Sequence, residues 1–374
     1  MAKDLFSSHP IFTPPTTEED RLSWLRLIRS ARVGPATFYR LMAEHGSAEA
    51  ALQALPDIAR AAGVPDYAAC PRDSAQAELD LARARGARML CFGTDAYPDA
   101  LASISDPPPI LWCLGQRAPI LRPMIALVGA RNASSLGTRM ARSLAEGLGQ
   151  AGYTIVSGLA RGVDTAAHKA SLKTGTIAVL GGGVDVIYPA ENASLAAEIA
   201  DQGLCLSEQP MGLQPMARHF PPRNRIISGL ALGVVVVEAA DKSGTLITAR
   251  DALDQGREVM AVPGHPVDGR AAGCNRLIRE GATLVRNVED VLGVVTRLQA
   301  PSAQATTPAA STTGAPDTTG LDRRICDLLG PSPMAEDQLI RDLDLPAAAV
   351  SSALVMLEMQ GAIRRHPGGL ISRA

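Results

Sequence analysis

The 374-residue chain has 46% hydrophobic residues, only 3% aromatic residues and a net charge of −2. This length allows two or three domains with substantial cores, and the composition excludes an intrinsically disordered chain. Because the charge is near neutral, any binding to nucleic acid has to come from local placement of cations. The six cysteines form no CxxC pair, which argues against a disulfide framework or a zinc site. With neither a signal peptide nor an apolar run of about 18 residues in view, we expect a cytoplasmic protein without a membrane span.

Residues 1–16 are expected to form a polar tail, and residues 17–88 a helical domain. A tight turn at Arg32–Thr37 places Pro35 where it can start a helix. This arrangement resembles a SAM-like, or helix-hairpin-helix, unit. Ten Lys/Arg and ten Asp/Glu in residues 18–88 balance one another, which favours a helical spacer over a hairpin that binds DNA phosphate.

The middle of the chain, residues 89–300, alternates short apolar runs with helical stretches. The expected strands are Met89–Phe92, Ile125–Val128, Thr154–Val156, Ile177–Leu180, Leu204–Leu206, Val234–Val237, Glu258–Val262 and Thr283–Val285. Continuous apolar runs of this kind are typical of strands buried on both faces of a parallel sheet. The sequence therefore predicts an α/β fold with an extended Rossmann-like parallel sheet, and a ligand site beyond the carboxyl ends of its strands.

The C-terminal part predicts a flexible linker at 301–320 and a winged-helix domain at 321–374. Its expected helices are Leu321–Leu329, Glu336–Arg341 and Pro346–Gln360, followed by a hairpin at Ala362–Ile371 with a Pro-Gly-Gly turn. The helix at Pro346–Gln360, in the position of a recognition helix, contains no basic residue. This favours a protein-contact or accessory role, although Arg364, Arg365 and His366 leave weak DNA contact open.

The segment His219–Arg225, HFPPRNR, is the clearest sign of a ligand. It lies in a window without Asp or Glu between Glu208 and Glu238, and it combines arginines with an aromatic ring. Arginine offers a fork for phosphate, and the ring of Phe220 offers a face on which a base can stack. We interpret this segment as a loop that binds a polyanion; the alternative is an ordinary solvated loop.

Four loops that follow strands add to this prediction. They are rich in small residues and hydroxyls: Gly129–Gly137, Ser157–Asp164, Gly181–Gly183 and Asp241–Thr245. Such loops present backbone amides to phosphate, and several in a row suit an extended strand better than a single nucleotide. Asp164 is expected to be an N-cap that leaves Ser157 and Gly158 facing the site, and His168 to be a packing residue.

Catalytic motifs are missing from the sequence: it has no Walker loop, HExxH, GxSxG or paired carboxylates in these loops. We therefore expect no enzyme activity, no cofactor and no metal site. Glu238 is interpreted as a residue that orients Arg223 or Arg225.

Six stretches, taken together, resemble the DprA/Smf family (DNA processing protein A). They are Val128–Arg131 with Ser134, Ser157–Ala170, Gly181–Asn192, Phe220–Leu230, Ser243–Arg250 and Val262–Ala282. The chain departs from relatives in having Ala217 where some have Lys, and Gly-Ala-Arg in place of Gly-Ser-Arg.

This resemblance implies a protein that binds and protects incoming single-stranded DNA in natural transformation and loads RecA recombinase onto it. It also implies a homodimer formed through the Rossmann domain. The single-stranded DNA site then comprises Arg131, Ser134, Ser157, Gly158, Arg161, Lys169, Arg218, Phe220, Arg223, Asn224, Arg225, Ser243, Gly244, Thr245 and Arg250.

Two other functions are weighed against this one. A nucleotide-binding Rossmann enzyme resembling phosphoribohydrolases would carry a PGGxGTxxE loop, but the matching loop here, KSGTLITAR, lacks the Glu. A transcription factor built on the winged helix would require a charged recognition helix.

Overall fold

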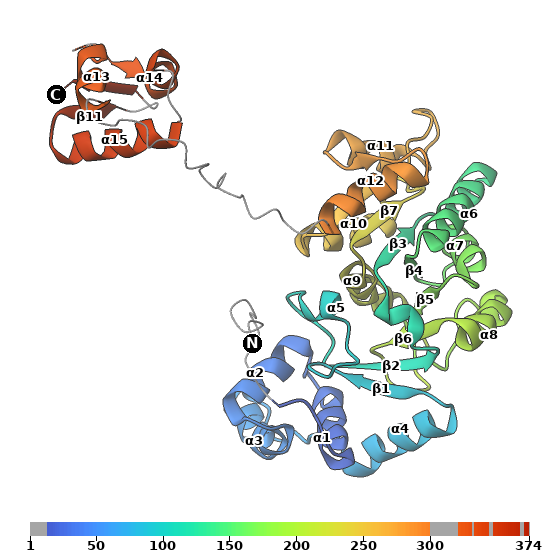
Figure 1. Cartoon of the computed structure of the whole chain (residues 1–374). Helices are drawn as coiled ribbons and strands as arrows, with labels where there is room; N and C mark the ends of the chain where they lie inside the picture. The colour runs from blue at the N-terminus through green and yellow to red at the C-terminus, as the bar shows by residue number, and fades with distance from the viewer. Residues whose placement is uncertain (1–12, 300–320, 331–332, 344–346, 367–369, 374) are drawn as a thin grey trace. The chain divides into compact units, whose positions relative to one another are not determined.

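The computed structural model describes residues 13–299, 321–330, 333–343, 347–366 and 370–373, and it divides into two units, residues 1–300 and 301–374 (Figure 1). Most of the predicted tail, the predicted linker at 301–320 and the predicted Pro-Gly-Gly turn lie outside the described residues. In the described part of the chain, no helix is long and apolar enough to cross a membrane.

Four helices begin the first unit: α1 (Glu18–Arg29), α2 (Pro35–His45), α3 (Ala48–Ala61) and α4 (Arg72–Ala84). Local sequence sets their ends. Thr17 and Asp20 form a capping box at the start of α1, and Gly46 ends α2 in the left-handed conformation that glycine adopts without strain. Pro35 is the first residue of α2, which confirms the predicted start of that helix.

A nine-stranded sheet follows, in the order β1-β2-β6-β5-β4-β3-β7-β8-β9. The strands are β1 (Arg88–Cys91), β2 (Ile110–Gly115), β3 (Met124–Val128), β4 (Thr154–Ser157), β5 (Thr176–Val179), β6 (Leu204–Ser207), β7 (Gly233–Val236), β8 (Glu258–Ala261) and β9 (Thr283–Leu284). All eight predicted strands are present to within about a residue. The strand β2 was not predicted. It pairs antiparallel with both β1 and β6, so the sheet is mostly rather than wholly parallel.

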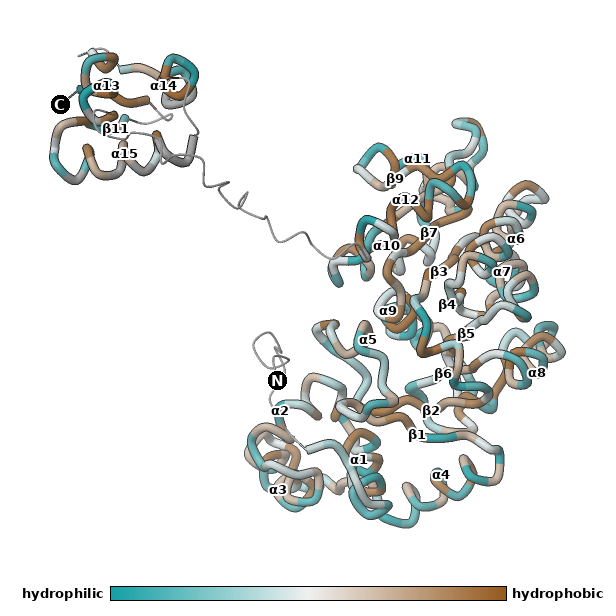
Figure 2. Tube along the Cα trace, in the orientation of Figure 1, coloured by the Kyte–Doolittle hydropathy of each residue, from teal (hydrophilic) through white to brown (hydrophobic). Residues whose placement is uncertain are grey.

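Helices cover both faces of this sheet, whose strands are hydrophobic along most of their length (Figure 2). One face packs against α5 (Asp99–Ala102), α9 (Phe220–Leu230), α10 (Thr245–Asp254) and α11 (Ala272–Arg279). The other face packs against α6 (Ser135–Gln150), α7 (Val163–Ser171), α8 (Ala193–Gln202) and α12 (Val288–Gln299). Strands buried on both sides explain the continuous apolar runs in the sequence.

Helices α1–α4 share a hydrophobic core with the β1, β2 and α8 end of the sheet. Glu78 of α4 strengthens this contact from a half-buried position. Its carboxylate pairs with Arg29 of α1 at 2.9 Å and accepts a hydrogen bond of 2.7 Å from the indole N–H of Trp112 in β2. The helical part therefore packs directly on the sheet.

The second unit has the three helices and small sheet of a winged helix. Its elements are α13 (Leu321–Leu328), β10 (Met334–Ala335), α14 (Glu336–Leu343), α15 (Ala347–Met359), β11 (Ile363–His366) and β12 (Leu370–Arg373). The sheet order is β10-β12-β11, and a separate core forms around Ile325, Leu354 and Ile371. The predicted fold class is confirmed in all three parts.

Candidate nucleic-acid interface

The candidate site lies where the strand order of the sheet reverses. From β3 the chain builds β4, β5 and β6 on one side and later β7, β8 and β9 on the other. The loops after β3 and β7 therefore diverge at the carboxyl edge and leave a crevice between them, which is where open α/β sheets bind ligands.

A continuous groove occupies this crevice. Its wider part, of about 860 Å³, is lined by the loops after β3 and β7 and by α9, and its narrower part, of about 260 Å³, lies over the loop after β4. Arg131, Tyr188, Phe220 and Arg223 line both parts. The structure thus brings together residues that are as much as 92 positions apart in the chain.

The ring of Phe220 is the centre of this arrangement. The guanidinium of Arg131 lies 5.2 Å from the ring centroid, and the ring of Tyr188 lies 5.8 Å away at an interplanar angle of 38°. Gly181 makes room for the ring, because a Cβ on that residue would lie only 2.9 Å from Cδ1 of Phe220. An aromatic pair flanked by cations offers flat faces to a base and charge to a phosphate.

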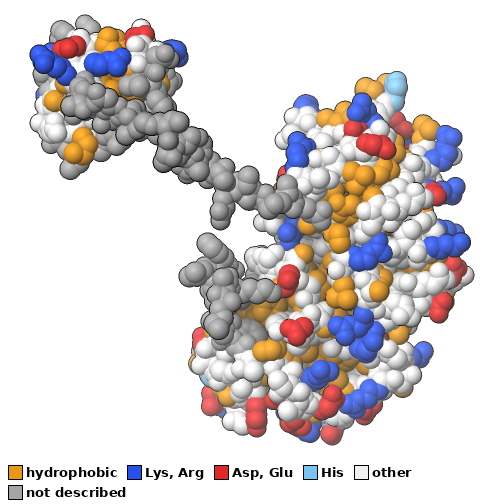
Figure 3. Space-filling model, viewed as in Figure 1, with side chains coloured by type: hydrophobic (Ala, Val, Ile, Leu, Met, Phe, Trp, Pro, Cys, Tyr) orange, Lys and Arg blue, Asp and Glu red, His pale blue; other side chains and the backbone are white. Residues whose placement is uncertain are grey.

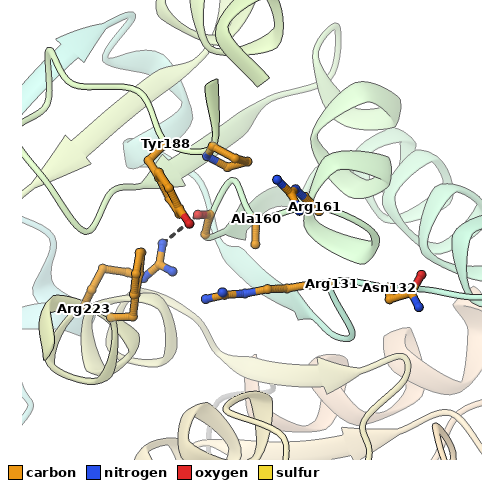
Figure 4. Close-up of a pocket in the computed structure, with 9 residues that line it drawn as sticks. Arg131, Asn132, Ala160, Arg161, Tyr188 and Arg223 are labelled. Atoms are coloured by element: carbon orange, nitrogen blue, oxygen red, sulfur yellow. Dashed lines mark hydrogen bonds between the residues drawn. The ribbon is translucent and has the colours of Figure 1, made fainter. Parts of the chain in front are cut away.

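Arg223 lies under the groove floor and is buried. Its guanidinium donates to the carbonyl of Gly158 at 2.7 Å (Figure 4). It also donates to the carbonyl of Val179, while its Nε has no hydrogen-bond partner. Burial lowers the pKa of Arg223 to about 10, which leaves the group cationic at neutral pH. The groove therefore contains a buried positive charge held by two carbonyl oxygens.

Two further titratable groups of α7 lie behind the loop after β4. Burial raises the pKa of the Asp164 carboxyl, and the charge of Arg223 opposes that rise. Burial, together with the charge of Arg223, lowers the pKa of His168 to about 3. His168 is therefore neutral, which agrees with its predicted role as a packing residue.

Models of protein families match all three parts of this chain. The model of DNA recombination-mediator protein A matches residues 88–296, more than half of the chain. The chain belongs to the DprA/Smf family. Models of the DprA-like N-terminal HHH domain and of the DprA winged-helix domain match residues 18–81 and 306–369.

Individual DprA and Smf proteins show the same relationship. DNA processing protein DprA of Streptococcus pneumoniae is 47% identical over 53% of this chain and 71% of its own length. Protein Smf of Synechocystis is 36% identical over 73% of this chain and 76% of its own length.

Two solved DprA structures also match. DprA from Streptococcus pneumoniae has a TM-score of 0.55 at 37% identity and covers 65% of this chain and 92% of its own. DNA processing protein A from Helicobacter pylori, described as having a unique single-stranded DNA binding mode, has a TM-score of 0.52 at 30% identity and covers 56% and 96%.

Several residues assigned by the DprA resemblance line the groove. They are Arg131, Gly158, Arg161, Phe220, Arg223, Asn224, Ser243, Gly244 and Thr245. Within this set, Arg161 is exposed and forms an ion pair with Glu191. Thr245 donates to the carbonyl of Gly129 at 3.2 Å, which links the loops after β3 and β7.

Other assigned residues do not line the groove. Ser157 is fully buried and donates to the carbonyl of Leu127 at 2.6 Å. Arg225 is directed away from the groove and forms ion pairs with Asp106 and Glu208, at 3.2 Å and 2.5 Å. Lys169, Arg218 and Arg250 are exposed but lie outside the groove lining.

The interpretation of Glu238 is wrong. Its carboxylate accepts hydrogen bonds from the backbone N–H of Ser134, at 2.8 Å, and from the Ser134 hydroxyl, whose oxygen in turn caps α6 by accepting from Gly137. Glu238 therefore stabilises the start of α6 and does not orient Arg223 or Arg225. It also occupies part of the loop Gly129–Gly137, whose backbone amides were predicted to bind phosphate.

Two further expectations are corrected. Asp164 is inside α7 rather than at its N-cap, which is Gly162, and its carboxylate binds loop amides instead of helix amides. The segment FPPRNR forms the first turns of α9 rather than a loop. Residues two apart on a helix project about 200° apart, so Arg223 and Arg225 face opposite directions.

Six polar residues of the groove lining are absent from the predicted site: Asn132, Asp164, Tyr188, Lys242, Thr248 and Arg270. Each lies within or directly beside a stretch that resembles the family, so adjacency was the available signal. Among the described residues, no group of three His, Cys, Asp or Glu is placed to hold a metal ion.

Proposed function

We propose that this chain binds single-stranded DNA in the groove at the carboxyl edge of its sheet. The observation that carries the proposal is the Phe220–Tyr188 pair between Arg131 and Arg223. Bases stack on the aromatic faces, Arg131 and Lys242 attract phosphates, and the wider part of the groove, of about 860 Å³, has room for more than one nucleotide. The Helicobacter pylori relative, described as a single-stranded DNA binder, supports the assignment.

The proposed role in the cell is that of the family. The chain protects incoming single-stranded DNA during natural transformation and loads RecA recombinase onto it. On DNA coated with single-strand-binding protein, the wild-type chain should shorten the lag of RecA ATP hydrolysis. A variant that binds no DNA should leave that lag unchanged, whereas shortening by such a variant would contradict the loading role.

The proposed assembly is a homodimer formed through the later part of the sheet domain. On the face in Figure 3, hydrophobic side chains gather over α10 and α12. Leu253 of α10 and Leu298 of α12 are 59% and 47% exposed, and Leu284 of the edge strand β9 is 40% exposed. Exposed apolar side chains on the elements around the β8–β9 edge of a sheet are typical of an association surface.

We propose a binding role rather than catalysis. Among the described residues that line the groove there is one carboxylate, that of Asp164, and it already accepts two loop amides. A hydrolase of the phosphoribohydrolase kind requires a carboxylate free to act on a bound nucleotide. Incubation with AMP should therefore release no adenine.

A titration of fluorescent oligo-dT and of a matching duplex tests the binding site. The wild-type chain should bind the single strand more tightly, with affinity that falls steeply as salt rises. Arg131→Gln should weaken binding and lower the slope of log affinity against log salt by about 0.7, the share of one phosphate contact in a single strand.

Arg117→Gln is the matched control, because Arg117 is exposed and follows β2 at the opposite edge of the sheet. It should bind as the wild type does. Equal affinity for duplex, or equal losses in the two variants, would remove the site from the groove.

A further inference from the structure

We infer that Asp164 is a positioning residue of the single-stranded DNA site. It holds the loop Gly158–Ala160 and the buried Arg223 in the arrangement that receives the strand. This inference rests on the proposed function and assigns a role to a carboxylate that the binding of a polyanion does not itself require.

The loop after β4 has an unusual backbone. Leu159 has a φ of 55°, and it is one of two described residues other than glycine with positive φ. A bulky side chain disfavours this left-handed conformation, and the Leu159 side chain is fully buried, so neighbouring groups have to hold the backbone in place.

Three side chains supply these contacts: those of Asp164, His168 and Asn192. The carboxylate of Asp164 accepts from the N–H of Gly158 at 3.1 Å and from that of Ala160 at 3.2 Å. Nε2 of His168 accepts from the N–H of Leu159 at 3.3 Å, and Asn192 donates to the Leu159 carbonyl at 2.9 Å. Three consecutive amides are therefore satisfied inside the protein.

The hydrogen bonds of these three amides hold the loop Gly158–Ala160 in place beside Arg223. Since these amides already donate to Asp164 and His168, they are not available to a phosphate, and the Gly158 carbonyl accepts from Arg223 at 2.7 Å. A Cβ on Gly158 would lie 2.5 Å from the same guanidinium, so the loop and Arg223 fit tightly. Movement of the loop would move Arg223.

Charge couples the same two residues. Asp164 and Arg223 are each 6% exposed, and the negative charge of Asp164 favours the cationic form of Arg223. Asp164 thus stabilises the buried cation as well as the loop that binds it.

The direction in which one substitution changes DNA affinity distinguishes a positioning role of Asp164 from a purely electrostatic effect of its charge. Asp164→Asn removes a negative charge from beside a polyanion site, which by itself strengthens DNA binding. Positioning predicts the reverse, because the neutral Asn amide binds the two loop amides more weakly and no longer offsets the charge of Arg223. Affinity for oligo-dT should fall about tenfold, which corresponds to roughly 1.4 kcal/mol. Glu191→Gln is the matched control, because Glu191 is an exposed carboxylate paired with Arg161 on the groove rim. This control should bind as tightly as the wild type or more tightly.

A double-mutant cycle tests whether Asp164 acts through Arg223. In the background Arg223→Gln, the further change Asp164→Asn should alter affinity less than twofold, because the two losses are not additive. Additive losses would contradict the coupling. Thermal melting monitored by circular dichroism establishes that each variant is folded.

The results distinguish failure of the proposed DNA-binding function from failure of the positioning role of Asp164. If the wild-type chain fails to bind oligo-dT, the proposed function fails. If the wild type binds and Asp164→Asn binds equally well or better, the positioning role fails. Should Asp164→Asn not fold, Asn192→Ala tests the same loop: weaker binding supports the role, and unchanged binding contradicts it.

Discussion

Replacing Arg225 by methionine should destabilise the fold and leave single-stranded DNA affinity unchanged. Arg225 lies on α9 with its side chain only 12% exposed, between Asp106 and the 15%-exposed Glu208. Burial raises the pKa of Glu208, and the charges of Arg225 and Arg29 oppose that rise. Removing Arg225 would leave the Glu208 carboxylate buried with less compensation.

The expected loss follows from this burial. Breaking a buried ion pair by removing one partner costs about 3–5 kcal/mol, and Arg29 near Glu208 favours the lower end, about 3 kcal/mol. The second contact adds little, because Asp106 is 45% exposed and exposed pairs contribute about 0–1 kcal/mol. The double variant Arg225→Met/Glu208→Gln removes both charges and should recover most of the loss.

Urea unfolding followed by tryptophan fluorescence measures this change, because Trp24 and Trp112, the two tryptophans of the chain, are buried in the first unit. Oligo-dT affinity is then measured on the folded variant. A variant of wild-type stability that binds DNA many times more weakly would refute the reasoning and return Arg225 to the DNA site.

Three further predictions concern the site, pH and assembly. Gly181→Ala should displace Phe220 and weaken oligo-dT binding, whereas Gly293→Ala, where nothing lies within 4 Å of the added Cβ, should not; equal affinities would contradict the packing argument. Burial lowers the pKa of His168 from 6.5 to about 3, so the unfolded chain binds a proton that the folded chain excludes. The contribution of His168 to the free energy of unfolding should be complete above pH 6.5 and fall towards pH 3 by up to about 1.4 kcal/mol per pH unit. His168→Gln should remove this contribution to the pH dependence measured by urea titration. Parallel pH profiles of the wild type and the variant would refute this. Light scattering should find a dimer that Leu253→Glu dissociates and the exposed-site control Leu121→Glu preserves; a monomeric wild type would contradict the proposed interface.

The strands were predictable because burial on both faces leaves a direct trace in sequence. Runs such as Ile177–Leu180 lack polar residues since each side chain meets a helix layer. The strand β2, Ile110–Gly115, was missed because it follows three prolines, Pro107–Pro109, that read as a loop. Its antiparallel pairing depends on β1 and β6, which periodicity along the chain cannot reveal.

The site was predictable in composition but not in the direction of its side chains. Arg223 and Arg225 look equivalent in the sequence, and only the helical geometry of α9 sends one to the groove and the other to Glu208. Glu238 and Ser134 are 104 positions apart, so nothing local in the sequence shows that this carboxylate binds the start of α6. Partners of this kind are fixed by which strands become neighbours.

Photo-crosslinking tests the central claim most directly. Oligo-dT carrying 5-iodouracil is irradiated with the full-length chain, and the crosslinked peptides are identified by mass spectrometry. If the strand lies in the groove, the crosslinks should fall on peptides that contain Phe220 or Tyr188, and Arg131→Gln should reduce their yield. Crosslinks confined to the winged-helix unit, residues 321–374, would contradict the account.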